Sequence, residues 1–348
     1  MSRVRPNIAE MVGYVPGEQP RGEKLIKLNT NENPYQCSPK VKAAIGRVVQ
    51  AGLHKYPDPL ATAFRIRAGE LLGVDPEWIL CGNGSDDILT IVTRSFVGTS
   101  DMVRFPTPSY LLYQTLAEIQ GAACDLIRYN DDWSLGDEFG AANDWIRLAY
   151  LANPNSPSGT MIPPERVAEL AAALPCPLLV DEAYVDFADT NCLALVAEND
   201  KIMVSRTLSK SYALAGLRFG YLVAQPHLIR ELRKVKDSYN CDSISIAGAT
   251  AAIDDQEWLA ANRTAILATR ARMTEALGEL GFHVADSQAN FVWCTHADAS
   301  HEAVYQQLKA AGVLVRYMRY ADWGDGLRIS VGTDEQVDAC LSLLKTMV

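Results

Sequence analysis

Residues 207–221 have the sequence TLSKSYALAGLRFGY, which begins where the short apolar run Ile202-Met203-Val204 ends. The apolar run predicts a buried strand, so Lys210 stands just beyond the carboxyl end of that strand. A lysine is a poor nucleophile while it is protonated, but partial burial and a neighbouring cation, here Arg218, make the proton easier to remove. The pattern therefore predicts a lysine with a chemical role.

The residues around this lysine predict a binding site for an anion. Thr207 and Ser209 supply hydroxyl groups, and Gly216 and Gly220 allow a tight loop. Such a loop brings hydroxyl groups and backbone amides to one anion. A reactive amine beside an anion site suits an aldehyde cofactor that carries a phosphate.

Short apolar runs alternate with helical patterns along the first two thirds of the chain. This alternation predicts an α/β fold with a mostly parallel sheet of about seven strands, covered by helices on both faces. Sites in such sheets lie at the carboxyl ends of the strands, where the polar motifs of this chain also fall. The predicted strands are centred on 79–80, 102–103, 126–127, 148–151, 178–180, 202–204 and 221–223.

The pattern changes after about Asp242, to a long helical stretch at 258–280 and then to shorter strand candidates at 291–293, 313–315 and 327–329. Thr333 and Gln336 form a plausible capping box for a last helix. We therefore predict an N-terminal arm at 1–30, a large domain at 31–242 and a smaller C-terminal α+β domain at 243–348.

Composition and charge narrow the classes of function. The chain has 348 residues, 48% of them hydrophobic and 21% charged, as in an ordinary folded enzyme. A net charge of −10 argues against nucleic-acid binding, which depends on clustered Lys and Arg. No apolar stretch is long enough to cross a bilayer and no signal-peptide pattern is present, so we expect no membrane association and a cytoplasmic location.

Metal chemistry is not indicated. The eight cysteines are scattered without a C-x-x-C pair, which suggests neither zinc ligands nor a disulfide framework. His296 and His301 are five residues apart and do not share a helical face as i,i+4 residues would. We therefore expect no metal site.

GNGSDD at residues 82–87 joins the first predicted strand to a helix that begins near Ser85. Exposed backbone amides at a helix start favour a phosphate. A plain capped turn would have the same sequence, so this motif is weak alone. Tyr110 follows the rigid segment 106–109, and it would either stack on an aromatic ligand or pack in the core.

LLVDEAYVDF at residues 178–187 has two carboxylates directly after a buried strand. An unpaired charge is costly there, so Asp181 needs a cationic partner, and a protonated pyridine nitrogen is one candidate. The alternative, a helix cap, fits Asp181 and Glu182 equally well. Tyr184 would hydrogen-bond the phenolic oxygen of the same ring.

Two further polar residues leave alternatives open. Asn153 begins NPNSPSG, which is either an ordinary loop or the source of a donor to a ring oxygen. Arg328 lies in the strand-like run LRIS, where it makes either a bidentate contact to an anion or a surface salt bridge.

Taken in order, NENP (31–34), YPDP (56–59), GNGSDD, PSY (108–110), NPNSPSG, VDEAYVDF, TLSKSYALAGLRFGY and LRISVGT (327–333) resemble the fold-type-I pyridoxal-phosphate aminotransferases. Among these the likeness is greatest to the histidinol-phosphate aminotransferases, and it covers nearly the whole chain. Eight ordered motifs are far more specific than any single one. The resemblance implies pyridoxal 5′-phosphate, glutamate and 2-oxoglutarate, histidinol phosphate, and ping-pong transamination.

The resemblance also implies roles for the cofactor residues. Lys210 would form the covalent link to the cofactor, Asp181 would pair with the pyridine nitrogen, and Tyr110 would stack on the ring. Asn153 and Tyr184 would hydrogen-bond the phenolic oxygen. The residues expected at the phosphate end are Gly84, Ser85, Asp86, Thr207, Ser209 and Arg218.

At the substrate end, the resemblance gives Arg328 the carboxylate of the amino donor and the anionic end of the acceptor. Tyr14, Asn31 and Arg316 are weaker matches there. Tyr56 would reach the phosphate in the neighbouring subunit, which implies a homodimer.

Departures from the family pattern concern the pocket more than the reacting groups. Ser156 and Ser158 stand where relatives often carry Asn and Thr, and Tyr35 follows NENP where a small residue is more usual. An aromatic-amino-acid aminotransferase is therefore the leading alternative, and threonine-phosphate decarboxylase is third. From other classes, a nicotinamide-dependent oxidoreductase would leave Lys210 unexplained, and a non-catalytic regulator would lack its basic DNA-binding region.

Overall fold

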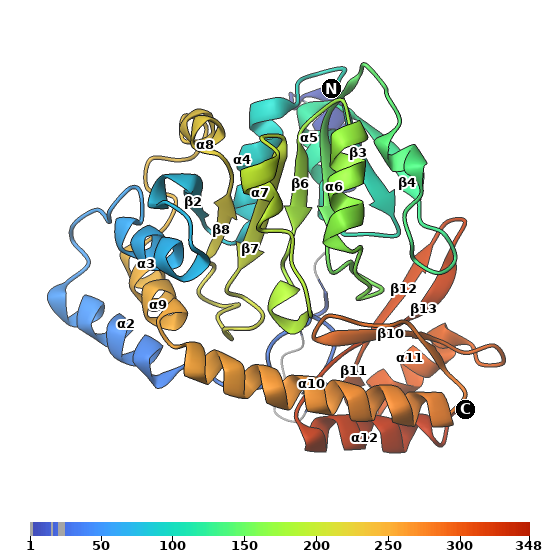
Figure 1. Ribbon diagram of the computed structural model, residues 1–348. Coiled ribbons are helices and arrows are strands. Elements are labelled where there is room, and N and C mark those ends of the chain that lie inside the picture. The colour runs from blue at the N-terminus through green and yellow to red at the C-terminus, as the bar shows by residue number, and fades with distance from the viewer. Residues whose placement is uncertain (1–2, 15–16, 20–24) are drawn as a thin grey trace.

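The computed structural model describes residues 3–14, 17–19 and 25–348 as an α/β structure with a large seven-stranded sheet and a smaller four-stranded one (Figure 1). The strand order of the large sheet is β2-β8-β7-β6-β5-β3-β4. Strand β8 is antiparallel to both neighbours, and the other adjacent pairs are parallel. All seven strands predicted from apolar runs are confirmed. They are β2 (Ile79–Gly82), β3 (Met102–Thr107), β4 (Ala123–Arg128), β5 (Ile146–Ala152), β6 (Leu178–Asp181), β7 (Ile202–Thr207) and β8 (Gly220–Val223).

Helices cover both faces of this sheet because its central strands bury alternate residues on opposite sides. Leu178 and Val180 belong to one buried cluster, and Leu179 between them belongs to the other. The first cluster lies under α2 (Pro39–Ala51), α3 (Thr62–Leu72), α6 (Pro164–Ala173), α7 (Leu195–Glu198) and α9 (Ser243–Ile253). The second lies under α4 (Ser85–Phe96), α5 (Leu112–Gln120) and α8 (Pro226–Leu232).

The four-stranded sheet is antiparallel and has the order β12-β13-β10-β9. It packs with three helices around a separate buried cluster that includes Val292, Leu327 and Leu344. The predicted capping box is confirmed, since Thr333 and Gln336 bond reciprocally at the start of the last helix. The elements are β9 (His283–Val284), β10 (Phe291–Thr295), β12 (Arg316–Tyr320), β13 (Gly324–Ser330), α10 (Gln256–Glu279), α11 (His301–Ala310) and α12 (Asp334–Leu344).

Strands β12 and β1 and helix α1 were not predicted, each for a physical reason. Strand β12 is partly exposed along its length and lacks an apolar alternation. Strand β1 (Ile26–Lys27) has only two residues and pairs in parallel with the distant β11 (Val313–Leu314), which was predicted at 313–315. Helix α1 (Pro6–Glu10) has five residues, none buried, and is anchored by side chains.

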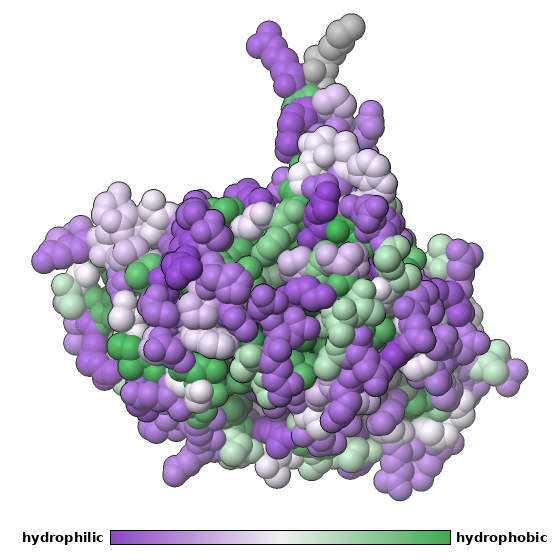
Figure 2. Space-filling view, turned by 45° about the horizontal axis from the view of Figure 1, so that its top comes forward, coloured by the Kyte–Doolittle hydropathy of each residue, from purple (hydrophilic) through white to green (hydrophobic). Residues whose placement is uncertain are grey.

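Near the N-terminus, helix α1 and the residue before it lie against α5, which covers the large sheet. Arg5 Nη2 donates to the Ile119 carbonyl at 3.1 Å and Asn7 Nδ2 to the Glu118 carbonyl at 2.7 Å, at the end of α5. On the face in Figure 2, hydrophilic residues predominate and hydrophobic ones lie in small patches between them. Within the described ranges, no helix has the length and apolar character needed to span a membrane.

Candidate active site

A cavity of about 270 Å³ lies where the carboxyl ends of the large sheet's strands face the small sheet. All the predicted site residues line it except Tyr56, Gly84 and Asn153. The residues brought together are Tyr14, Asn31, Ser85, Asp86, Tyr110, Asp181, Tyr184, Thr207, Ser209, Lys210, Arg218, Arg316 and Arg328.

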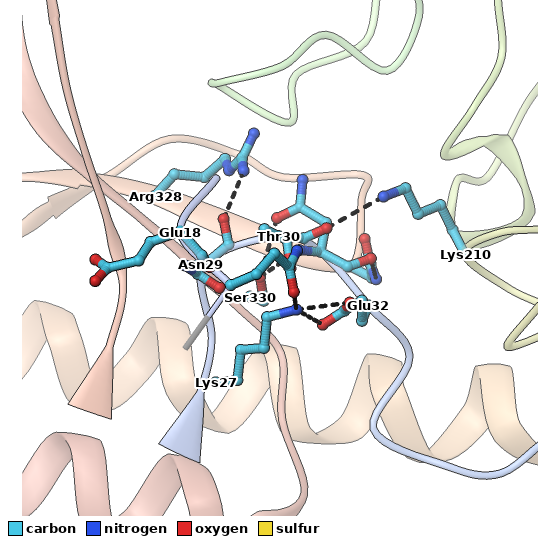
Figure 3. Close-up of polar contacts among 11 residues, drawn as sticks. Glu18, Lys27, Asn29, Thr30, Glu32, Lys210, Arg328 and Ser330 are labelled. Atoms are coloured by element: carbon cyan, nitrogen blue, oxygen red, sulfur yellow. Dashed lines mark hydrogen bonds and ion pairs between the residues drawn. The ribbon is translucent and has the colours of Figure 1, made fainter. Parts of the chain in front are cut away.

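Lys210 enters the cavity from the loop after β7. Its Nζ donates to the Thr30 carbonyl at 3.2 Å and lies 5.7 Å from the centre of the Tyr184 ring. Asn33 Nδ2 donates to the Lys210 carbonyl at 3.1 Å and fixes the backbone from the other side. Figure 3 shows Lys210 and Arg328 pointing toward the segment that contains Asn29 and Thr30.

Gly84 and the start of α4 form a cradle with Arg218. Gly84 has φ +84°, a conformation that favours glycine, and a Cβ there would lie 2.5 Å from Arg218 Nη2 and displace that guanidinium. Arg218 Nη2 contacts Asp86 Oδ2 at 3.2 Å and Nη1 contacts Ser209 Oγ at 3.4 Å. No side chain caps the first turn of α4, where Ser85 begins the helix. Amides, hydroxyls and a guanidinium therefore meet at one end of the cavity, as an anion requires.

Asp181 ends β6 and is 4% exposed, whereas Glu182 turns away from the cavity. Burial raises the pKa of Asp181 to about 6, and hydrogen bonds from Tyr113 and Ser205 oppose that rise. Glu182 Oε2 instead accepts from Arg206 Nη2 at 2.8 Å. The structure thus separates the two carboxylates that the sequence left equivalent.

Asn31 and Tyr184 meet beside the lysine. Asn31 has a left-handed backbone, φ 56°, and its Nδ2 donates to the Tyr184 hydroxyl at 3.0 Å. Ser330 Oγ accepts from the Asn31 amide at 2.8 Å and donates to Asn31 Oδ1 at 3.0 Å. Strand β13 therefore sets the position of the Tyr184 hydroxyl through one intervening side chain.

Two arginines face the opposite end of the cavity from adjacent strands. Arg316 of β12 and Arg328 of β13 are direct cross-strand partners, and like charges in such a pair repel. Arg328 Nη1 donates to Ser156 Oγ at 2.9 Å and Nη2 to the Asn29 carbonyl at 3.0 Å, while its buried Nε has no hydrogen-bond partner on the described residues. Burial lowers the pKa of Arg328. An anion between the two guanidinium groups would offset their repulsion and accept a hydrogen bond from Arg328 Nε.

Asn153 does not face the cavity. It is fully buried, its Nδ2 donates to the Ile162 carbonyl at 2.9 Å, and its Oδ1 accepts from the Ile162 amide at 2.8 Å. This geometry does not support the donor role predicted for Asn153, because the side chain closes its own loop. From the same loop Ser156 lines the cavity instead.

Tyr56 also lies outside the cavity, with 81% of its surface exposed. Its ring stacks on Tyr239 with centroids 4.4 Å apart. Tyr110 lines the cavity and donates to Asp86 Oδ1 at 3.2 Å, and its ring meets the edge of Tyr14 at 5.9 Å.

Sequence reasoning missed Tyr113, Ser205 and Ser156. Tyr113 follows Tyr110 by three residues, but Tyr110 precedes α5 and Tyr113 lies within it, so helical spacing gave no signal. Ser205 lies beside Asp181 on the neighbouring strand, a pairing that appears only once the register is known. Within the described part of the chain, no group of three His, Cys, Asp or Glu residues is placed to hold a metal ion.

Residues 23–344 match the model of the family described as aminotransferase class I and II. The chain belongs to this family. This aminotransferase is 55% identical, over 98% of its length and 94% of the relative, to a histidinol-phosphate aminotransferase of Rhodopirellula baltica. It is 44% identical to histidinol-phosphate aminotransferase 1 of Nostoc sp., with 99% and 98% of the two chains covered.

Solved structures give the same result for the fold of this aminotransferase. A histidinol-phosphate aminotransferase of Sinorhizobium meliloti, in complex with pyridoxal-5′-phosphate, superposes with a TM-score of 0.90 at 27% identity, covering 100% of this chain and 99% of that chain. The aspartate aminotransferase of Thermus thermophilus superposes at 0.85 with 20% identity and complete coverage of both chains, which indicates a shared fold. The family membership favours transamination over the oxidoreductase that the sequence left open.

Proposed function

We propose that this aminotransferase uses pyridoxal 5′-phosphate to transfer an amino group between histidinol phosphate and 2-oxoglutarate. The observation that carries this proposal is 55% identity over nearly the whole chain to a histidinol-phosphate aminotransferase. Lys210, Asp181 and the two arginines lie around one cavity, an arrangement that supports it.

The cavity fits the cofactor by the chemistry of its donors. Arg218, Ser209 and the uncapped start of α4 suit a phosphate. Gly84 keeps this cradle open, because it has a positive φ and no side chain that would meet Arg218. At the other end of the ring, Asp181 is a buried carboxylate suited to a protonated pyridine nitrogen.

The proposed roles of the residues follow from their positions. When bound, pyridoxal phosphate supplies an aldehyde and a ring that withdraws electrons from the substrate carbon. Lys210 Nζ holds the cofactor covalently and, once released, moves a proton at the substrate carbon. Asp181 keeps a proton on the ring nitrogen. Tyr184, oriented by Asn31, hydrogen-bonds the phenolic oxygen.

Ser156 is the group of the 153–159 loop that we propose for the remaining contact to the ring or the substrate. Its oxygen accepts from Arg328 Nη1, which leaves its own proton available for the cavity. We propose it in place of Asn153, since the amide of Asn153 is bonded to Ile162.

The paired arginines support a substrate with an anionic end. Arg328, with Arg316 beside it, would take the carboxylate of glutamate and the phosphate of histidinol phosphate in turn. Tyr14 at the cavity edge would contact the rest of the substrate. The two substrates share one site, so ping-pong kinetics are expected.

We also propose a homodimer, because Tyr56 is exposed, stacks on Tyr239 and does not line the cavity of its own chain. Tyr56 would contribute to the phosphate end in the partner subunit. We retain the division into an arm at 1–30, a large domain at 31–242 and a small domain at 243–348, and a cytoplasmic location, as parts of the same proposal.

A substrate screen on the purified protein tests the proposal. With 2-oxoglutarate as acceptor, histidinol phosphate should give a much higher kcat/KM than phenylalanine. A better rate with phenylalanine would identify an aromatic-amino-acid aminotransferase instead. Release of carbon dioxide from threonine phosphate would identify a decarboxylase, and absence of any cofactor-dependent turnover would favour a non-catalytic role.

A further inference from the structure

Each carboxyl oxygen of Asp181 accepts a hydrogen bond from a separate buried hydroxyl group. Tyr113 donates to Oδ2 at 2.9 Å from helix α5, and Ser205 donates to Oδ1 at 3.1 Å from strand β7. Ser205 is the register partner of Asp181 on the neighbouring strand. The carboxyl group is therefore held from two elements and in one orientation.

Tyr113 is itself fixed in the second buried cluster. It has no exposed surface, and its ring stacks on Tyr150 with centroids 4.5 Å apart and planes 5° apart. Its edge meets Tyr110, the predicted ring-stacking residue, at 5.6 Å. Burial and the neighbouring Asp181 raise the pKa of Tyr113 well above its ordinary value, so it keeps its proton and remains a donor.

The surroundings of Asp181 otherwise oppose ionisation. Burial has the largest effect, and the negative charge of Asp86 on α4 adds to it. Tyr110 and Tyr150, which also face this charge, remain neutral because burial raises their pKa values. The Tyr113 and Ser205 hydroxyls, with the Ala183 backbone amide, act in the opposite direction.

We propose that Tyr113, with Ser205 as the second donor, is a positioning residue that keeps Asp181 ionised and aligned to receive the protonated ring nitrogen of the cofactor. The inference rests on the proposed use of pyridoxal phosphate. Tyr113 touches neither the cavity nor, by this account, the substrate, so it acts through Asp181. Its ring also contacts Tyr110, the residue predicted to stack on the cofactor ring.

The test is the pH dependence of cofactor affinity in the apoprotein. Asp181 must be ionised to pair with the pyridinium. The affinity for the cofactor should therefore decrease at pH values lower than the pKa of Asp181. Removing one hydroxyl donor should raise the pKa of Asp181 by about one unit, since two or three such bonds lower a carboxyl pKa by about two units. The pH at which cofactor affinity declines should rise by the same amount.

Tyr113→Phe keeps the ring and removes the donor, and Ser205→Ala does the same on the other oxygen. Tyr150→Phe is the matched control, because Tyr150 is equally buried and stacks on Tyr113, but its hydroxyl bonds to Leu89 and Thr93. Pyridoxal phosphate binding would be titrated by absorbance between about pH 5.5 and 8.5. Near pH 6, the first two variants should bind about fivefold more weakly than wild type, and near pH 8 they should match it.

Tyr150→Phe should retain the wild-type profile. The inference would be overturned if the pH at which affinity declines were unchanged in both Tyr113→Phe and Ser205→Ala. It would also be overturned if this pH rose equally in Tyr150→Phe. If Tyr113→Phe does not fold, Ser205→Ala alone decides the matter. Failure of the wild-type protein to bind pyridoxal phosphate at any pH would refute the proposed function instead, so the two failures are distinguishable.

Discussion

Replacing Asp181 with asparagine should stabilise the apoprotein while it destroys the proposed activity. The carboxyl group is buried without a cation beside it among the described residues, and burial raises its pKa to about 6. In the unfolded chain its pKa is about 3.9. The folded protein therefore binds this proton more tightly than the unfolded chain does.

The sign and size of the effect follow from this difference. The contribution of Asp181 to stability is highest below about pH 4, falls as pH rises toward about 6, and then levels off. About two pKa units correspond to roughly 3 kcal/mol of lost stability at neutral pH. Asparagine carries no charge, so the free energy of unfolding of Asp181→Asn should exceed that of wild type by roughly 1.5 kcal/mol near pH 5 and about 3 kcal/mol near pH 8.

Urea unfolding of the two apoproteins across this pH range measures the difference. The decisive quantity is how the difference in free energy of unfolding changes with pH. New contacts of the asparagine would change that difference by the same amount at every pH. Asp131→Asn is the control: its side chain is 90% exposed and pairs with Arg128, so it should gain no stability. A difference between Asp181→Asn and wild type that does not grow with pH would refute the reasoning.

Three further changes test the ends of the cavity. Arg328→Gln should lower kcat/KM for histidinol phosphate by roughly 30- to 1,000-fold with little change in cofactor affinity, because it removes a partly buried guanidinium from an anion. An unchanged kcat/KM would contradict its role. Ser156→Ala should raise KM about tenfold or more, since Arg328 loses a hydrogen-bond acceptor, and steady-state kinetics measures this change. A normal KM would show that Ser156 has no role in substrate binding. Gly84→Ala should lower the free energy of unfolding in urea by about 1–3 kcal/mol and weaken cofactor binding, because its backbone has φ +84° and its Cβ would meet Arg218. Wild-type stability and wild-type cofactor affinity would show that the cradle tolerates a side chain.

The large sheet and much of the site could be predicted because their signals are local. Buried parallel strands are short apolar runs, and the polar residues directly after them share one edge of the sheet. Lys210, Asp181 and Thr207 were found in this way, and each lines the cavity. The capping box of the last helix is local for the same reason.

Contacts between distant segments could not be predicted. The bonds from Tyr113 and Ser205 to Asp181 depend on strand register and on how α5 packs, neither of which the sequence states. Asn153 was assigned its role from the family resemblance, but in the structure its amide closes its own loop and Ser156 faces the cavity. The role predicted for Tyr56 depends on a contact with a second subunit.

The central claim is that Lys210 carries the cofactor, and chemical trapping tests it most directly. The purified protein would be loaded with pyridoxal phosphate, reduced with borohydride, digested and mapped by mass spectrometry, with Lys210→Ala as the control. We predict a single pyridoxyl-modified peptide that contains Lys210 and is absent from the variant. Modification of a different lysine, or an equal yield of modified peptide from Lys210→Ala, would contradict the account.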